Sequence, residues 1–346
     1  MKKHCVIPTL TTICLLIGLT LSNAARADLG AQKDSQGVSR KQPKENSQRP
    51  DSEEGINGVP VMWEDPVDLE SRDLFYGIGG QKGEPDPSDK FVFIKEDTGG
   101  HAKKIHVKDG KGREWRVKFG LEPRPETAAT RIIWAVGYHA DQAYYVRHAR
   151  IEGYVEPDVS DVRFERDDDG YKKAGRWDWN SNPFVGTREL DGLKTLMALL
   201  NNFDLKGDNN KIIRPGKKKP SESAKLIYFV SDLGATLGST GHWFTGLPVL
   251  GELPLGNKGV ANQFAEHRFI DGVSKGEVQF HMQRRRANRA LQAVKVENAR
   301  WMGGLLARLS DKQLTDAFRA GGFDETETFT YVRALCDRIK QLQNLK

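Results

Sequence analysis

The sequence predicts an α+β fold in which a strand-rich part with antiparallel pairing precedes a mainly helical part. Three observations support this prediction. Residues 91–119 alternate apolar and polar side chains between glycine-containing turns, as half-buried strands do. Residues 186–236 combine an apolar helix pattern with two short apolar runs. Residues 284–346 carry apolar side chains at helical spacing. Taken in order, the chain divides into segments 1–27, 28–58, 59–145 and 146–346.

Residues 1–27 have the pattern of a cleaved export signal. A basic start at Lys2 and Lys3 precedes an apolar stretch, and Ala25 and Ala27 fit a small-x-small cleavage site. The apolar stretch is short for a membrane span, so we expect cleavage after Ala27 and no stable membrane anchor. The mature chain is then expected in the periplasm or secreted. Residues 28–58 are almost free of apolar side chains and are predicted to be a disordered polar linker.

Cysteine content and charge limit the possible classes of protein. The signal contains Cys5 and Cys14, so only Cys336 would remain and no intramolecular disulfide could form. Removing the three cations of the signal lowers the formal net charge from +6 to +3. A charge this small does not indicate nucleic-acid binding. The composition gives no indication of the oligomeric state.

Three antiparallel strands are predicted over residues 91–96, 103–109 and 113–119, and residues 59–89 are expected to pack on them. Alternation in the third strand places Trp115 and Val117 on one face and Lys118 on the other. The first turn contains Gly99 and Gly100, which relieve backbone strain in such turns.

A helix is predicted from Arg124 to Gly137, because Pro125 suits its first turn and Gly137 suits its end. Glu126 lies in the first turn, eight residues after Lys118. Two interpretations stay open: Glu126 pairs with Lys118, or it only complements the helix N-terminus. Glu122 is the other candidate partner for Lys118. Residues 138–185 are expected to connect the two parts of the fold.

The segment 186–236 carries the most informative pattern. Leu190, Leu193, Met197 and Leu200 lie on one face of a predicted helix, and a polar cluster with Asp204, Lys206 and Asn209 follows. Residues 211–213 and 225–230 are predicted to form a hairpin that ends at Asp232. Two acids and an amide held by rigid elements suit a divalent metal that faces a phosphate.

The order helix, D-x-K-x-x-N, hairpin and D-x-G resembles the catalytic core of the protein-kinase-like fold. The resemblance covers roughly residues 90–245. Within this fold, the sequence is similar to the atypical members, namely the phosphatidylinositol kinases and the secretory-pathway kinases. Two features depart from the usual pattern: no His-Arg pair precedes Asp204, and Leu233 replaces the usual phenylalanine. The resemblance implies a two-lobed structure with a β-rich N-lobe over residues 59–145 and a mainly helical C-lobe over residues 146–346.

The resemblance also implies a role for each candidate residue. Asp204 would orient the acceptor hydroxyl, and Lys206 would lie near the transferred group. Asn209 and Asp232 would hold Mg²⁺ or Mn²⁺ on ATP. The residues implied in binding the nucleotide phosphates are Gly99, Gly100, Lys118 and Glu126.

The rest of the sequence narrows the alternatives. Residues 238–248 occupy the position of an activation segment, but no A-P-E sequence follows, which weakens the case for a protein acceptor. Ser310 with Gln313 forms a capping-box signature in the helical C-terminal part. Zinc-binding spacings, a G-x-S-x-G elbow and a Walker A sequence are all absent from the chain.

Three hypotheses about function therefore follow from the sequence. The first is an exported, metal-dependent enzyme that transfers a phosphoryl group from a nucleotide to an unknown hydroxyl acceptor. The second is a catalytically inactive binding module on the same fold, because ATP is scarce outside the cytoplasm. The third is an unrelated exported α+β protein in which these acids and amides are turn caps.

Overall fold

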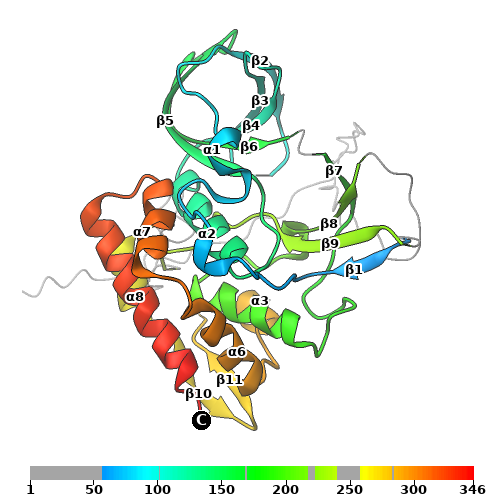
Figure 1. The fold of residues 1–346 in the computed structure, drawn as a ribbon, viewed down its shortest axis with the longest axis vertical. Helices are drawn as coiled ribbons and strands as arrows, with labels where there is room; N and C mark the ends of the chain where they lie inside the picture. Colours follow the sequence, from blue (N-terminus) through cyan, green and yellow to red (C-terminus); the bar gives the residue numbers. More distant parts are fainter. Residues whose placement is uncertain (1–56, 101, 168–169, 217–222, 240–257, 283) are drawn as a thin grey trace, which may run out of the picture. The chain divides into compact units, whose positions relative to one another are not determined.

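Five strands form a closed barrel in the order β2-β3-β4-β6-β5 (Figure 1). In the computed structural model the described residues are 57–100, 102–167, 170–216, 223–239, 258–282 and 284–346. The first three barrel strands are β2 (Phe91–Asp97), β3 (Lys104–Lys108) and β4 (Glu114–Lys118), which confirms the predicted antiparallel strands. The other two are β5 (Ala143–Glu152) and β6 (Asp158–Arg166).

The barrel interior holds one apolar cluster that includes Phe91, Trp115, Val117 and Phe164. The predicted alternation in β4 is confirmed, because Trp115 and Val117 are fully buried in this cluster. The side chain of Lys118 therefore lies on the opposite face of the strand and points away from the barrel interior. It is still only 4% exposed, since helix α2 (Pro123–Ala135) packs against β5 and β6.

The barrel continues past residue 145, where the sequence placed the end of the strand-rich part. β5 runs through that position, and β5 pairs with β6 along most of its length. The strand-rich part therefore extends to Arg166, and residues 146–166 do not belong to the helical part. The charged side chains in this segment concealed its alternation, because two of them, Arg163 and Glu165, lie in buried ion pairs.

A second sheet has the strand order β1-β9-β8-β7. Its centre is the predicted hairpin, formed by β8 (Asn210–Pro215) and β9 (Lys225–Val230). β7 (Tyr171–Gly175) pairs with β8, and β1 (Val59–Val61) pairs in parallel with β9. The sequence predicts that the segment 59–89 packs on the strand-rich part. It contacts the barrel through Tyr144, whose hydroxyl donates to the Gly80 carbonyl, but β1 joins the second sheet.

Helices follow and flank this sheet. The predicted helix is α3 (Arg188–Leu199), which packs against α6 (Val296–Leu306) (Figure 1). The predicted helical C-terminal part contains α5 (Arg285–Ala290), α6, α7 (Asp311–Ala320) and α8 (Glu325–Gln343). The capping box of Ser310 and Gln313 is present at the start of α7. Further elements that the sequence did not predict include α4 (Ala261–Glu266) and the hairpin of β10 (Ile270–Ser274) and β11 (Glu277–Phe280).

The observed architecture is a mixed α+β fold, as predicted. All described residues belong to one compact unit, which spans Gln48–Lys346. Within the described residues, none of the helices combines the length and the apolar character that crossing a membrane requires. The predicted signal of residues 1–27, nearly all of the linker of residues 28–58, and residues 240–248 of the activation-segment position lie outside the described residues.

Candidate functional site

Lys118 lies at the meeting point of three carboxylates. Its Nζ is 2.5 Å from Oε2 of Glu122, 2.9 Å from Oε2 of Glu126 and 3.4 Å from Oδ1 of Asp232. Both candidate partners that the sequence offered on α2 therefore pair with Lys118. The acid that follows β9, 114 residues later in the chain, joins them.

Local structure explains why these groups meet. Trp115 and Val117 lie on the face of β4 that points into the barrel. Lys118 lies on the opposite face, on the side of α2. Pro123 lies at the first position of α2, so the helix begins immediately after Glu122 and places Glu126 in its first turn. β9 ends at Val230, and the chain then turns so that the Gly234 N–H donates to Oδ1 of Asp232.

The second oxygen of Glu126 contacts a buried arginine of β6. Nη1 of Arg163 is 2.5 Å from Oε1 of Glu126, and Arg163 also forms an ion pair with Glu165. Arg116 of β4 extends this chain of charges, with Nη1 3.2 Å from Oε1 of Glu165. Glu126 thus lies between two cations, one on each carboxylate oxygen.

Burial and neighbouring charges set the protonation of this cluster. Burial opposes the charge on Lys118, but the carboxylates of Glu126, Asp232 and Glu122 outweigh it and raise the pKa of the ammonium. Burial also opposes the charge on Asp232, yet Lys118 and the Gly234 N–H lower the pKa of this carboxyl. At neutral pH, Lys118 and Asp232 are therefore both charged.

A second group of candidates lies in the loop between α3 and β8. Nζ of Lys206 is 2.8 Å from Oδ2 of Asp204. The side-chain amide of Asn209 donates to the carbonyl oxygen of Asp204 at 2.7 Å, and Asn202 accepts from the Asp204 N–H at 3.0 Å. The loop therefore holds Asp204, Lys206 and Asn209 as one hydrogen-bonded unit.

Backbone contacts join this loop to the segment around Asp232. The carbonyl oxygen of Asn209 accepts from the Ser231 N–H at 2.9 Å, one residue before Asp232. The N–H of Phe203 donates to the Ala235 carbonyl at 3.2 Å. The segment around Asp232 also contacts α2, because the Leu233 N–H donates to Oε1 of Glu126 at 3.4 Å. The structure therefore links all three segments, although no direct contact joins the carboxylates of Asp204 and Asp232 in the described part of the chain.

Gly99 and Gly100 lie in the turn between β2 and β3. The Gly99 N–H donates to Oδ1 of Asp97, and Gly100 has a φ of +79° that favours glycine. These facts account for the glycines as turn residues, and their implied role toward a phosphate stays a prediction.

Carboxylate oxygens, which a hard divalent cation prefers as ligands, gather at this site. Glu122, Glu126 and Asp232 each place a carboxylate oxygen within 4.8 Å of the others. Both oxygens of Glu126 already contact cations, however, and Glu122 forms ion pairs with Lys118 and Lys258. Asp232 is the accessible acid, with a side chain that is 45% exposed. The amide oxygen of Asn209 accepts no hydrogen bond from any described residue. Asp232 and Asn209 are thus available to Mg²⁺ or Mn²⁺, which prefer oxygen ligands.

Sequence reasoning missed Arg163, Glu165 and Lys258. The available signal for the first two was the alternation in Val162-Arg163-Phe164-Glu165, where apolar residues enter the barrel and charged residues lie on the other face of the strand. Lys258 gave no signal, because its partner Glu122 is 136 residues away in the chain.

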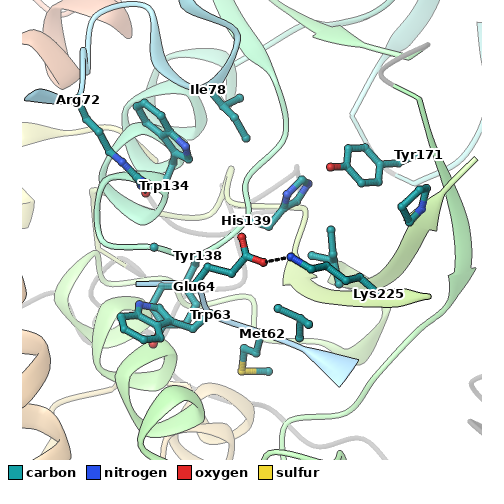
Figure 2. A pocket seen from close by; sticks show the side chains of 14 residues that line it. Met62, Trp63, Glu64, Arg72, Ile78, Trp134, Tyr138, His139, Tyr171 and Lys225 are labelled. Carbon is teal, nitrogen blue, oxygen red and sulfur yellow. Dashed lines mark hydrogen bonds and ion pairs between the residues drawn. The ribbon is translucent and has the colours of Figure 1, made fainter. Parts of the chain in front are cut away.

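A cavity of about 280 Å³ lies elsewhere in the fold, near the end of α2 that is opposite to Glu126. Figure 2 shows its aromatic wall, with Trp134, Tyr138, His139 and Tyr171, and the ion pair between Glu64 and Lys225. Its lining includes none of the candidate residues. This cavity is therefore separate from the candidate site.

Comparisons with known proteins give one structural similarity. A scan against protein-family models finds no match, and a search of curated proteins also finds none. A solved structure, the crystal structure of a Helicobacter pylori proinflammatory kinase CtkA, matches with a TM-score of 0.42 and 12% sequence identity. The match covers 75% of this chain and 94% of that chain. Similarity at this level is too low to assign a family.

Proposed function

We propose that this chain is a kinase-like phosphotransferase that moves the γ-phosphoryl group of ATP to a hydroxyl acceptor with the help of Mg²⁺ or Mn²⁺. One observation carries the proposal: Lys118 of the barrel pairs with Glu126 of α2 and lies 3.4 Å from Asp232, the acid of the D-x-G sequence. A strand lysine, a helix acid and a metal-binding acid are the parts that phosphoryl transfer needs in such enzymes.

In the proposed mechanism, Lys118 neutralises the phosphates of ATP. The interactions of Glu126 with Lys118 and Arg163 fix the position of that lysine, so little reorganisation is needed when the nucleotide binds. Asp232 and Asn209 would hold the metal, which would supply further positive charge beside the transferred group.

Asp204 is the proposed group that accepts the proton of the acceptor hydroxyl. Its Oδ2 accepts from Lys206 at 2.8 Å and from the Asn209 amide at 3.5 Å, and these contacts orient the carboxylate. The hydroxyl oxygen bonds to the γ-phosphorus while the bond to the β–γ bridging oxygen breaks. ADP leaves, and the proton passes to Asp204 and then to solvent.

A binding module on the same fold is the second candidate, and one observation favours it. The side chain of Lys118 is only 5% exposed and already contacts three acids, two of which also interact with other cations. A site that is already neutralised in this way gains less from an incoming phosphate than a free lysine would. Export to the periplasm or beyond, proposed from residues 1–27, is compatible with either candidate.

Catalysis is tested by measuring the formation of ADP from ATP in the presence of Mn²⁺ or Mg²⁺. Water serves as the acceptor in this assay. Wild-type protein is compared with Asp204→Asn and with the control Asp337→Asn, whose exposed side chain lies on α8. We expect wild type and the control to form ADP, and Asp204→Asn to lose at least about 100-fold in rate. Equal rates in all three proteins would overturn the proposed role of Asp204. ATP binding without turnover would favour the binding module.

A further inference from the structure

A pocket of about 470 Å³ borders the loop that carries Asp204. Leu205, Lys206 and Gly207 of this loop form one part of its wall, and α5 forms another. Lys206 contacts both the pocket and Asp204, since its Nζ is 2.8 Å from Oδ2 of that acid. A molecule in this pocket would therefore lie next to Lys206, the residue that contacts the proposed proton acceptor.

The charged groups of the wall favour an anion. Arg286 and Arg289 of α5 are exposed, line the pocket and form no ion pair with any described residue. Two acids also line it, but both are engaged. Asp208 is 2.8 Å from Nη1 of Arg176, and Asp178 accepts a hydrogen bond from the Asn180 N–H. Lys206 is itself paired with Asp204, so the unpaired cations of the wall are Arg286 and Arg289. They face Asp178, the one acid of the wall without a cation partner among the described residues.

The remaining wall favours a small compound over a large one. Trp177 and Trp179 line one side, with ring centroids 4.9 Å apart, and Leu205 and Ala290 are also present. The volume lies within the range of small-molecule sites, about 300–1,000 Å³. Both indole rings are almost fully buried, so the exposed guanidinium groups are the part of the wall open to a ligand. A pocket of this size with two such groups suits a small hydroxyl compound that carries a charged group.

We propose that this pocket is the acceptor site, and that the acceptor is a small anionic hydroxyl compound whose phosphate or carboxylate is bound by Arg286 and Arg289. This inference rests on the proposed phosphotransferase function. The bound anion would place a hydroxyl of the same molecule at Asp204. That hydroxyl oxygen would then bond to the γ-phosphorus of ATP as ADP leaves, and its proton would pass to Asp204.

Direct binding tests this inference without any need for turnover. Glucose, glucuronate and glucose 6-phosphate have the same ring and differ in charge, so they separate neutral, carboxylate and phosphate probes. Their dissociation constants are measured by titration calorimetry for wild type, for Arg286→Ser/Arg289→Ser, and for the control Arg285→Ser. Arg285 is an exposed arginine of the same helix that does not line the pocket.

At least one anionic sugar is expected to bind wild type and the control about tenfold more tightly than glucose, as one or two charge-assisted hydrogen bonds provide. The double variant should lose this preference. Whichever anion binds identifies the phosphate or the carboxylate as the recognised group. Equal binding of all three sugars, including no measurable binding at millimolar concentration, would overturn the inference. So would an anion preference that survives in the double variant.

Nucleotide binding is measured on the same samples, as the rise in melting temperature with ATP and Mg²⁺. This measurement also verifies that the double variant is folded. Nucleotide stabilisation without anion preference contradicts the acceptor class and leaves the phosphotransferase proposal standing. Anion preference without nucleotide stabilisation contradicts the phosphotransferase proposal, and with it the assignment of the pocket as an acceptor site.

Discussion

Nη1 of Arg163 lies 2.5 Å from Oε1 of Glu126, on the opposite side of the carboxylate from Lys118. Glu126 is 1% exposed, and this burial raises the pKa of its carboxyl against the opposing effect of the two cations. Arg163 therefore has a positioning role in this account. It keeps Glu126 in place, and Glu126 in turn keeps Lys118 at the proposed nucleotide site.

Replacing Arg163 by methionine should destabilise the protein strongly. The change removes one partner of a buried ion pair and leaves two buried acids, Glu126 and Glu165, with less compensation. We expect a loss of about 3–5 kcal/mol in the free energy of unfolding, measured by urea denaturation. The matched control is Arg150→Met, because Arg150 pairs with Asp158 on the exposed surface of the barrel and should cost about 1 kcal/mol or less.

A double-mutant cycle separates this pair from a general packing effect. If Arg163 acts through Glu126, Arg163→Met combined with Glu126→Gln should cost less than the sum of the two single variants. Strictly additive costs would contradict the positioning role. The ATP-induced rise in melting temperature of any folded variant gives a second readout, which a purely structural arginine would not change.

Substitution of Gly234 by alanine should destabilise the protein, because a Cβ atom there would lie 2.7 Å from Cδ and 2.8 Å from Cβ of Glu122. We expect a cost of about 1–3 kcal/mol in thermal or urea unfolding. Gly304→Ala is the control, since Gly304 lies within α6 and a Cβ atom there would meet nothing within 4 Å. That change should stabilise the helix by about 0.5–1 kcal/mol. Effects of the same sign at both positions would contradict the contact between Gly234 and Glu122.

The sequence was sufficient to predict the elements that carry the site. Period-two alternation identified β4 and the exit of Lys118 from the barrel interior, and helical spacing identified α3. These patterns are local, because they depend on which face of one strand or helix is buried. The ion pair of Lys118 with Glu126 of α2 is one of two interpretations that the sequence left open, and it came from the resemblance to the protein-kinase-like fold.

The contacts that complete the site could not be predicted in this way. Arg163 and Lys258 reach Glu126 and Glu122 across 37 and 136 residues, so only the folded topology brings them together. Charged side chains in β6 concealed the strand. A charged side chain is expected to be buried only where it has a partner of opposite charge, and the sequence does not show which residue that partner is. The pocket beside Lys206 likewise needs α5, a short helix that no local pattern connects to the loop of Asp204.

His139 should make stability depend on acidity. Burial lowers the pKa of His139 to about 4, from an ordinary value of 6.5. Its ring packs against Tyr171 (Figure 2) and also against Phe229. Above pH 6.5 the ring is neutral in both the folded and the unfolded chain. As the pH falls from 6.5 to about 4, the unfolded chain binds a proton first, so stability is lost over this window, by about 2–3 kcal/mol at most.

The measurement for His139 is the free energy of unfolding against pH for wild type and His139→Gln. The variant should lose less stability between pH 6.5 and 4 than wild type does. His267→Gln provides a parallel case, because burial also lowers the pKa of His267 to about 4. Identical pH profiles for wild type and His139→Gln would contradict the account of this buried ring.

The central claim, a metal-dependent nucleotide site at Lys118 and Asp232, is tested most directly by thermal unfolding of the full chain. Melting is recorded with and without ATP plus Mg²⁺ or Mn²⁺ for wild type, Asp232→Ala and the control Asp337→Ala, whose exposed acid lies on α8. A ligand at a hundred times its dissociation constant stabilises the native state by about 2.7 kcal/mol. We predict a metal-dependent rise in melting temperature for wild type and the control, and none for Asp232→Ala. No rise in any of the three proteins, or an equal rise in all of them, would contradict a nucleotide site at this place.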